Sequence, residues 1–381
     1  MQILGVLAFI AALLISVMVH EFGHFITARK FGMRVSEFFV GFGKRIWSTT
    51  RGETEYGVKV IPAGGYCRIE GMTPTDPMPD GQEERAFWRA SSLKKLIVLG
   101  AGSTAHFIIG FLLIFVILFG IGYTTYQPII DKVEPASPAA IVGLQGGDRV
   151  LSINGKEFVN WNDGVNTIAR SEGKELSIVV LRDGKELTFE TAAVYYEKEK
   201  RFRLGIYPQY QTVVARDSFT KAGAQAGETT WFLTKESVRS LYNLPKKIPE
   251  LFRQTFMGEE RDPNGLVGVV GAARVSGEVV ANKGDTKNEK VTTFLLIVAS
   301  LNIFVGIFNL LPVLPLDGGH MAVAIADEIR AFFARLRRRP RPAPINVNVL
   351  TPVTGVVVVL LGILTLLLVI ADIFNPVSLN L

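Results

Sequence analysis

Four long apolar runs constrain the fold of this chain more than any other feature of its sequence. Each run reaches the roughly 20 residues that a membrane-spanning helix needs. They occupy residues 1–19, 96–123, 292–316 and 349–373. Nearly half of the 381 residues are hydrophobic (48%), and the mean hydropathy is +0.30. The sequence therefore predicts a polytopic α-helical membrane protein with four transmembrane helices.

The placement of Lys and Arg predicts how these helices are oriented. Basic residues gather in the loop between the first two runs and in the loop between the last two, whereas both ends of the chain lack them. Because basic loops stay in the cytosol, both termini and the long segment 124–291 are expected outside. The net charge of +6 then reflects topology, and no nucleic-acid partner is expected. The first run is not expected to be a cleavable signal peptide, because its charges follow the apolar stretch.

A zinc-binding pattern lies at the end of the first apolar run. His20 and His24 are four residues apart, so on a helix both imidazoles lie on one face and can share a metal ion. Glu21 lies beside that face, where a carboxylate can take a proton from metal-bound water. With a rise of about 1.5 Å per residue, His20 lies nearly 30 Å from the outer end, close to the cytosolic side. We expect a catalytic zinc site there, with Glu21 as the base.

Catalytic zinc usually takes three protein ligands and leaves a fourth position for water. The extended pattern H-E-x-x-H-x-x-G-x-x-H would need Gly and His at positions that hold Thr27 and Lys30. Glu37 is one candidate for the third ligand. Asp317 is the better candidate, because it follows an apolar run and two prolines that interrupt helical hydrogen bonding at the cytosolic end of a span. The alternative interpretation of Asp317 is an ordinary helix cap.

Together these motifs resemble the site-2 protease family of intramembrane zinc metalloproteases, in its bacterial form with four spans and one PDZ domain. The family's H-E-x-x-H matches residues 20–24. Its N-x-x-P-x-P-x-x-D-G matches residues 309–318, although the second proline, Pro315, comes one position later than usual. The family's G-P-x-x-N corresponds to residues 102–106, where Ser103 stands in place of Pro and His106 in place of Asn.

The resemblance covers nearly the whole chain and implies one Zn²⁺ per chain, held by His20, His24 and Asp317. It implies that Asn309 or His106 holds the extended substrate or its oxyanion, with plain helix packing as the alternative for His106.

Glycine-interrupted strands follow the first span, at residues 41–43 and 62–68, and include Gly64 and Gly65. In the family this region resembles a membrane-associated β-hairpin whose edge receives the substrate. An unwound substrate segment would pair with that edge as an added strand. An ordinary solvent-exposed hairpin is the alternative. Cys67, the single cysteine, excludes an intramolecular disulfide and is expected to be a small buried side chain.

The remaining segments complete the expected domain organisation. Residues 124–213 have the alternating pattern of a β-rich domain and resemble a bacterial PDZ domain, which either binds a peptide terminus or excludes bulky substrates. Residues 214–291 form an amphipathic linker region. Residues 1–123 and 292–381 supply the two halves of the membrane core.

The resemblance implies a protease of the bacterial cytoplasmic membrane, with its active site near the cytosolic side. Its substrate would be a single-pass membrane regulator, such as an anti-sigma factor, cut earlier outside by a site-1 protease. Remnants of signal peptides are a second substrate class.

Two other functions compete with the protease. One is a PDZ-containing membrane scaffold or receptor whose metal site is only structural. The other is a metal transporter, which would need more acidic or His residues along its spans than His106 and Asp372 in the second and fourth spans.

Overall fold

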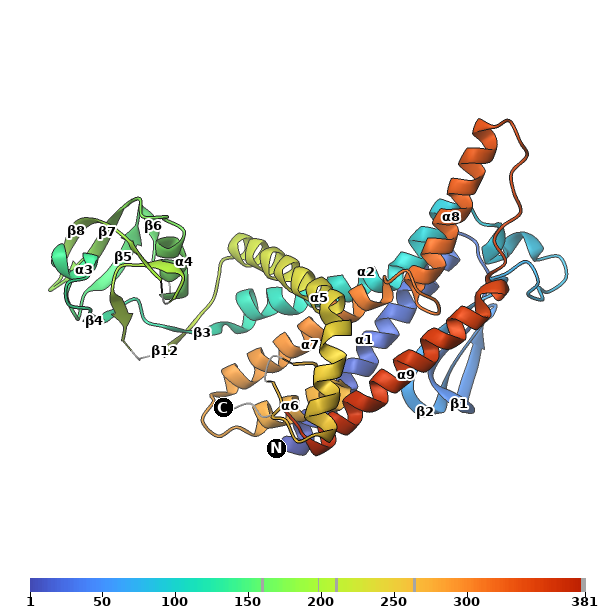
Figure 1. Ribbon diagram of the computed structural model, residues 1–381, viewed down its shortest axis with the longest axis horizontal. Helices are drawn as coiled ribbons and strands as arrows, with labels where there is room; N and C mark the ends of the chain where they lie inside the picture. Colours follow the sequence, from blue (N-terminus) through green and yellow to red (C-terminus); the bar gives the residue numbers. More distant parts are fainter. Residues whose placement is uncertain (159–160, 198, 210–211, 263–264, 378–381) are drawn as a thin grey trace. The chain divides into compact units, whose positions relative to one another are not determined.

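The computed structural model describes residues 1–158, 161–197, 199–209, 212–262 and 265–377. These residues form two compact units, one made of Met1–Val116 with Gly223–Leu381 and the other of Ile117–Ala222 (Figure 1). Four helical segments are long and apolar enough to cross a membrane, as predicted. They are Gln2–Lys30, Ser92–Ile121, Lys287–Asn309 and Val347–Phe374.

The first unit is mainly helical. Its long helices are α1 (Gln2–Lys30), α2 (Ser92–Val116), α5 (Phe219–Phe256, shared with the second unit), α6 (Val269–Ala281), α7 (Lys287–Asn309), α8 (Asp317–Leu336) and α9 (Thr351–Phe374). Short turns of helix are η1 (Glu83–Arg85), η2 (Phe87–Arg89), η3 (Ile117–Ile121, which extends α2 into the second unit) and η4 (Val347–Leu350). Helix α2 packs against α1, α7 and α8, and Figure 1 shows α1, α2 and α7 side by side. This three-helix contact forms the interior on which the candidate site is built.

A long β-hairpin follows α1. Strand β1 (Val35–Arg51) pairs antiparallel with β2 (Thr54–Ile69), and the chain reverses at Gly52, whose φ of +66° suits glycine. Strand β2 packs against α1, so closely that a Cβ on Gly65 would lie 2.5 Å from the sulfur of Met18. The hairpin therefore places one edge of β2 beside the helix that carries His20.

The helix formed by the third apolar run is shorter than the run itself. Helix α7 stops at Asn309, residues 310–316 form consecutive turns, and a new helix, α8, begins at Asp317. Two glycines allow this return, because a Cβ on Gly318 would lie 2.2 Å from the Leu310 carbonyl oxygen, and one on Gly319 would lie 2.5 Å from the Leu314 nitrogen. The tight turn brings the start of α8 back against the helices.

Helix α9 is tied to the rest of the first unit by a buried ion pair at its C-terminal end. Asp372 and Arg261 lie 3.1 Å apart, with side chains 1% and 2% exposed. The Asp372 carboxylate also accepts hydrogen bonds from the backbone N–H groups of Gly268 and Gly271 at the start of α6. These contacts neutralise the one acidic residue of the span and explain its presence without a transported metal.

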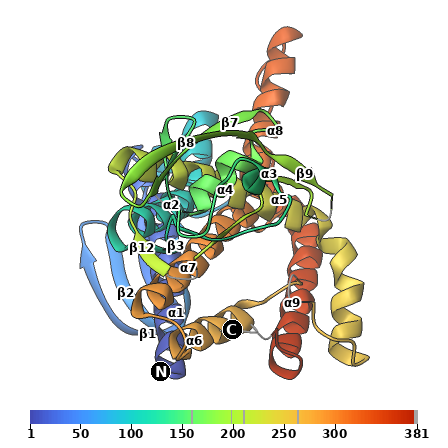
Figure 2. The same cartoon turned by 90° about the vertical axis from the view of Figure 1, so that its left-hand side faces the viewer.

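The second unit is small and rich in strands. Its main sheet has the order β6-β5-β7-β8, with every neighbouring pair antiparallel (Figure 1). Figure 2 shows the paired strands β7 and β8 from another direction. Its strands are β3 (Tyr123–Tyr126), β4 (Ile130–Val133), β5 (Arg149–Ile153), β6 (Lys156–Glu157), β7 (Glu175–Arg182), β8 (Lys185–Ala192), β9 (Val194–Tyr196), β10 (Arg201–Arg203), β11 (Ile206–Pro208) and β12 (Thr212–Ala215). Helices α3 (Pro138–Ile141) and α4 (Trp161–Ala169) complete it. Buried side chains such as Ile130, Leu176 and Ile178 form a core of its own.

Candidate metal centre and active site

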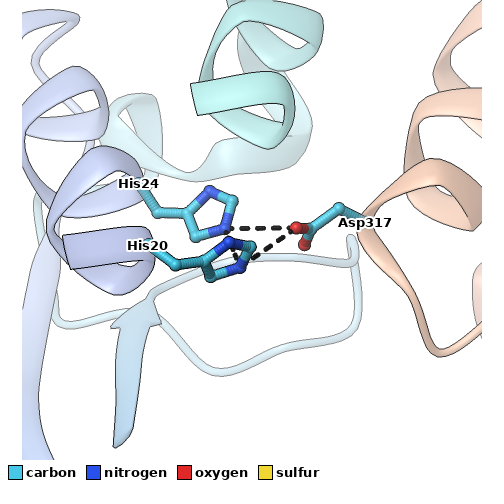
Figure 3. Close-up of side chains that lie close together, drawn as sticks. All are labelled: His20, His24 and Asp317. Atoms are coloured by element: carbon cyan, nitrogen blue, oxygen red, sulfur yellow. Dashed lines mark hydrogen bonds and ion pairs between the residues drawn. The ribbon is translucent and has the colours of Figure 1, made fainter. Parts of the chain in front are cut away.

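Three ligand-type side chains meet between α1 and the start of α8. The Nε2 atoms of His20 and His24 lie 3.1 Å apart, and each lies 3.3 Å from Oδ2 of Asp317 (Figure 3). Both histidines are 7% exposed, and Asp317 is half-buried. The site thus joins residues almost 300 positions apart through the i, i+4 spacing of α1 and the turn before α8.

These distances fit a zinc ion. In a tetrahedral site with bonds of about 2.0–2.1 Å, neighbouring ligand atoms lie about 3.3–3.4 Å apart. The separations of 3.1, 3.3 and 3.3 Å match one triangular face of such a tetrahedron. Two imidazoles and one carboxylate would hold the metal and leave its fourth position for water, as in catalytic rather than structural zinc sites.

The orientation of His24 is fixed by the backbone of α2. Its Nδ1 lies 2.8 Å from the Val98 carbonyl oxygen, which can only accept a hydrogen bond, so Nδ1 carries the proton and Nε2 is free for the metal. The second nitrogen of His20 is different. Its Nδ1 is buried and has no hydrogen-bond partner in the part of the chain that the structure describes.

Glu21 is held in place by the hairpin. Its Oε2 accepts a hydrogen bond of 2.9 Å from the backbone N–H of Cys67 in β2. That contact turns the carboxylate of α1 toward β2 and leaves its other oxygen available to take a proton. The hairpin and the candidate base are therefore connected directly.

Cys67 contributes its backbone rather than its thiol. Burial, reinforced by the nearby charge of Glu21, raises the pKa of the Cys67 thiol to about 12. At neutral pH the thiol keeps its proton, so it is a poor metal ligand and a poor nucleophile. The Cys67 side chain is half-buried, and so is more exposed than the small buried side chain that the sequence predicts.

Gly102 in α2 lets the helix approach the two histidines. A Cβ at this position would lie 2.5 Å from both Cε1 of His20 and Nε2 of His24. Real Cβ atoms do not come so close to other heavy atoms, so any side chain here would push the ligands apart. Gly100, on another face of α2, meets only the end of Met321 at 3.8 Å.

We expect Gly102→Ala to impair zinc binding and catalysis, while Gly100→Ala does not. A displacement of reacting groups by about 1 Å costs on the order of 100-fold in rate. Both substitutions raise helix propensity by about 1 kcal/mol, so their difference isolates the clash. Zinc affinity and proteolytic rate of the two purified variants check the prediction. Equal behaviour of the two would show that the ligands tolerate the displacement.

The other predicted site residues lie on α2, α7 and β2. Gly64 and Gly65 are in β2, on the strand that packs against α1. Asn309 is the last residue of α7, and its side chain makes no hydrogen bond to the three ligands within the described residues. His106 lies beside His20, with ring centroids 5.0 Å apart, but its Nδ1 is bonded to Asn302.

Glu37, the other candidate for the third ligand, lies away from the cluster. Its carboxylate accepts hydrogen bonds from Tyr66 and Arg68 and lies 3.9 Å from Lys59, so it braces the hairpin.

The sequence did not point to three groups that shape the site. The Cys67 N–H and the Val98 carbonyl are backbone atoms that leave no mark in a sequence. Asn302 is an amide within an apolar run and could have been noticed, because polar groups are costly inside a span.

Comparison with known proteins agrees with this geometry. Residues 8–360 match peptidase family M50. The zinc metalloprotease Rip1 of Mycobacterium tuberculosis is 34% identical over 415 aligned residues, which cover 100% of this chain and 99% of the relative. Rip1 of Mycolicibacterium smegmatis is 32% identical over 98% of both chains. A putative zinc metalloprotease of Helicobacter pylori is 31% identical over 82% of this chain and 86% of its own.

The match to the family spans most of the chain and includes the helices that carry His20, His24 and Asp317. The chain therefore belongs to peptidase family M50, the site-2 protease family, and is a zinc metalloendopeptidase.

Proposed function

We propose that this zinc metalloprotease hydrolyses peptide bonds in or near the transmembrane segment of a membrane-anchored regulator. The observation that carries the proposal is which helix supplies the metal ligands. Two of its three ligands, His20 and His24, are buried on α1, which is itself one of the four helices apolar enough to span a membrane. A scissile bond brought to this cluster would lie beside apolar helices rather than in a cleft that is open to water.

In the proposed chemistry, His20, His24 and Asp317 hold the zinc ion. When bound, zinc acts as a Lewis acid toward water and the scissile carbonyl. Glu21 takes a proton from the attacking water and passes it to the leaving amine. The Cys67 N–H fixes one carboxylate oxygen of Glu21, so the proton is handled by the other.

The edge of β2 is the proposed platform for the substrate. Peptide bonds within a helix are shielded, so a transmembrane substrate must first be extended. Gly64 and Gly65 keep this part of β2 free of side chains next to α1, and an extended segment could pair there as an added strand. Asn309, at the end of α7, is the proposed side-chain contact for the extended substrate.

The proposed topology follows from charge. Lys and Arg concentrate in residues 29–95 and 330–341, so these loops would face the cytosol and both termini would lie outside the cytoplasmic membrane of a bacterium. The ligands lie near the basic end of α1, which supports an active site near the cytosolic side.

The second unit is the proposed PDZ domain, on the outer side of the membrane. It has a groove of about 290 Å³ between α4 and residues 201–208, with an apolar floor that includes Trp161, Val165 and Leu204. An extended peptide end of the substrate, exposed by an earlier cut by a site-1 protease, would fit such a groove. The expected substrates are anti-sigma-factor-like regulators, with signal-peptide remnants as the class to compare.

A reconstitution experiment tests the proposal. Enzyme and a single-span probe with an anti-sigma-type sequence are placed in the same vesicles, and the cut is located by mass spectrometry. We expect a cut within or next to the span, loss of cleavage on chelation and recovery with zinc. Cuts confined to the soluble parts of the probe would contradict the proposal. A signal-peptide probe cleaved in preference would assign the substrate to that class.

A further inference from the structure

A chain of buried polar side chains crosses the three packed helices. Ser16 in α1, His106 in α2 and Asn302 in α7 are 4%, 2% and 1% exposed. Asn302 Nδ2 lies 3.0 Å from Ser16 Oγ, and Asn302 Oδ1 lies 2.8 Å from His106 Nδ1. Polar groups inside apolar helices are costly, so a connected set of them indicates a role beyond packing.

The direction of each hydrogen bond among Ser16, Asn302 and His106 can be deduced. Asn302 Nδ2 also lies 2.8 Å from the carbonyl oxygen of Val298, which only accepts, so the amide group of Asn302 is fixed with its nitrogen on that side. Its oxygen therefore faces His106, and Nδ1 of His106 must carry the hydrogen. In the neutral ring, Nε2 of His106 then has a lone pair. His106 in this tautomer offers an acceptor, and it cannot donate to an oxyanion.

His106 faces the zinc ligand that lacks a second contact. Its ring centroid is 5.0 Å from that of His20, with the planes tilted by 39°. The Nδ1 of His20 lies against α2, since a Cβ on Gly102 would be 2.6 Å from it, and His106 follows Gly102 by one helical turn on the same face. Histidines that bind a metal through one nitrogen almost always donate a hydrogen bond from the other. His24 does so to Val98, whereas Nδ1 of His20 has no such partner among the described residues and the ring of His106 lies beside that of His20.

We propose that His106 and Asn302 are positioning residues for His20. Asn302 sets the tautomer of His106. When zinc is bound, Nε2 of His106 accepts the Nδ1–H of His20, a hydrogen bond that the two rings do not form in the structure described here, and this contact directs Nε2 of His20 at the metal. The inference rests on the proposed role of His20 as a zinc ligand. It replaces the substrate-holding role considered for His106 with a contact to the metal ligand.

Two amide substitutions of His106 distinguish the roles of its two ring nitrogens. Gln places its amide near the position of Nε2, where its oxygen can accept from His20, whereas Asn places its amide near Nδ1 and leaves the side facing His20 empty. Zinc affinity is measured by competition with a chelator, and the Co²⁺-substituted protein reports ligand geometry through its visible spectrum. We expect His106→Asn to lower zinc affinity by about 10–100-fold and to shift the Co²⁺ spectrum. His106→Gln should stay near wild type in both.

Asn302 tests the second half of the proposal. We expect Asn302→Leu to reproduce the loss seen for His106→Asn, and the double variant to lose no more than either single one, because both changes break the same connection. Ser300→Ala, a change at a half-buried position of the same helix, is the matched control. Circular dichroism and size-exclusion chromatography confirm that each variant is folded.

The outcomes separate this inference from the proposed site. If His20→Ala binds zinc like the wild type, the ligand assignment itself is wrong. If His20→Ala loses zinc but both His106 variants bind it normally with a lower kcat, His106 contacts the substrate and the positioning role is overturned. If both His106 variants also keep their kcat, the residue only fills space, and the inference is again overturned.

Discussion

Replacing Glu21 with Gln is expected to lower the rate of peptide hydrolysis by about 10³-fold while zinc remains bound. General acid–base catalysis contributes about 10²–10⁴-fold to rates of this kind. The amide oxygen of the introduced side chain can still accept the hydrogen bond from the Cys67 N–H, so the local fold is kept, but an amide cannot take up a proton at neutral pH. Cleavage of the single-span probe and zinc content are measured on the same preparations.

The matched control is Glu236→Gln, the same chemical change at a half-exposed position of α5. It should leave cleavage and zinc content unchanged. A Glu21→Gln enzyme that cleaves at a tenth of the wild-type rate or faster would remove Glu21 from the role of base. Loss of zinc together with activity would instead assign Glu21 to the metal site.

Replacing Asp317 with Asn is expected to weaken zinc binding more than any change outside the ligand set. Changes to groups that merely support a ligand cost about 10–100-fold in affinity, so loss of a charged ligand should exceed about 100-fold. The amide of Asn is similar in size but neutral, and the remaining pair, His20 and His24, is too few for a catalytic zinc site. Competition with a chelator gives the affinity, and added zinc should restore part of the activity.

Asp327→Asn is the control on the same helix. Asp327 lies ten residues after the ligand Asp317 in the sequence. It pairs with Arg330 and accepts a hydrogen bond from the Ile345 backbone. We expect wild-type zinc affinity for this variant. If the zinc affinity of Asp317→Asn stays within about tenfold of wild type, the loss is too small for a direct ligand. Asp317 would then not be the third metal ligand.

Much of the candidate site could be predicted from the sequence because it consists of side chains at fixed helical spacing. His20, Glu21 and His24 are recognisable as a group since four residues make almost one turn of a helix. Asp317 could be proposed only by its context of prolines and glycines, because nothing local links it to residue 20. The 3.3 Å distances to both histidines come from the return of α8, which depends on tertiary packing.

For the fold, too, the sequence predicted the main elements but not where all of them end. Apolar runs gave four long helices, since composition alone makes a segment long enough to span a membrane. Composition did not reveal that the third helix ends at Asn309 or that Asp317–Leu336 forms a separate helix. Nor did it reveal that Phe219–Phe256 is one continuous helix, because Pro245 and Pro249 lie inside it and prolines usually end helices.

The hydrogen bond from Cys67 to Glu21 has an evolutionary consequence. Its donor is a main-chain N–H, which every amino acid except proline supplies. Position 67 can therefore change its side chain over generations without loss of this contact, provided that the strand keeps its path. A search for invariant residues would overlook this support, because what selection preserves here is the course of the backbone.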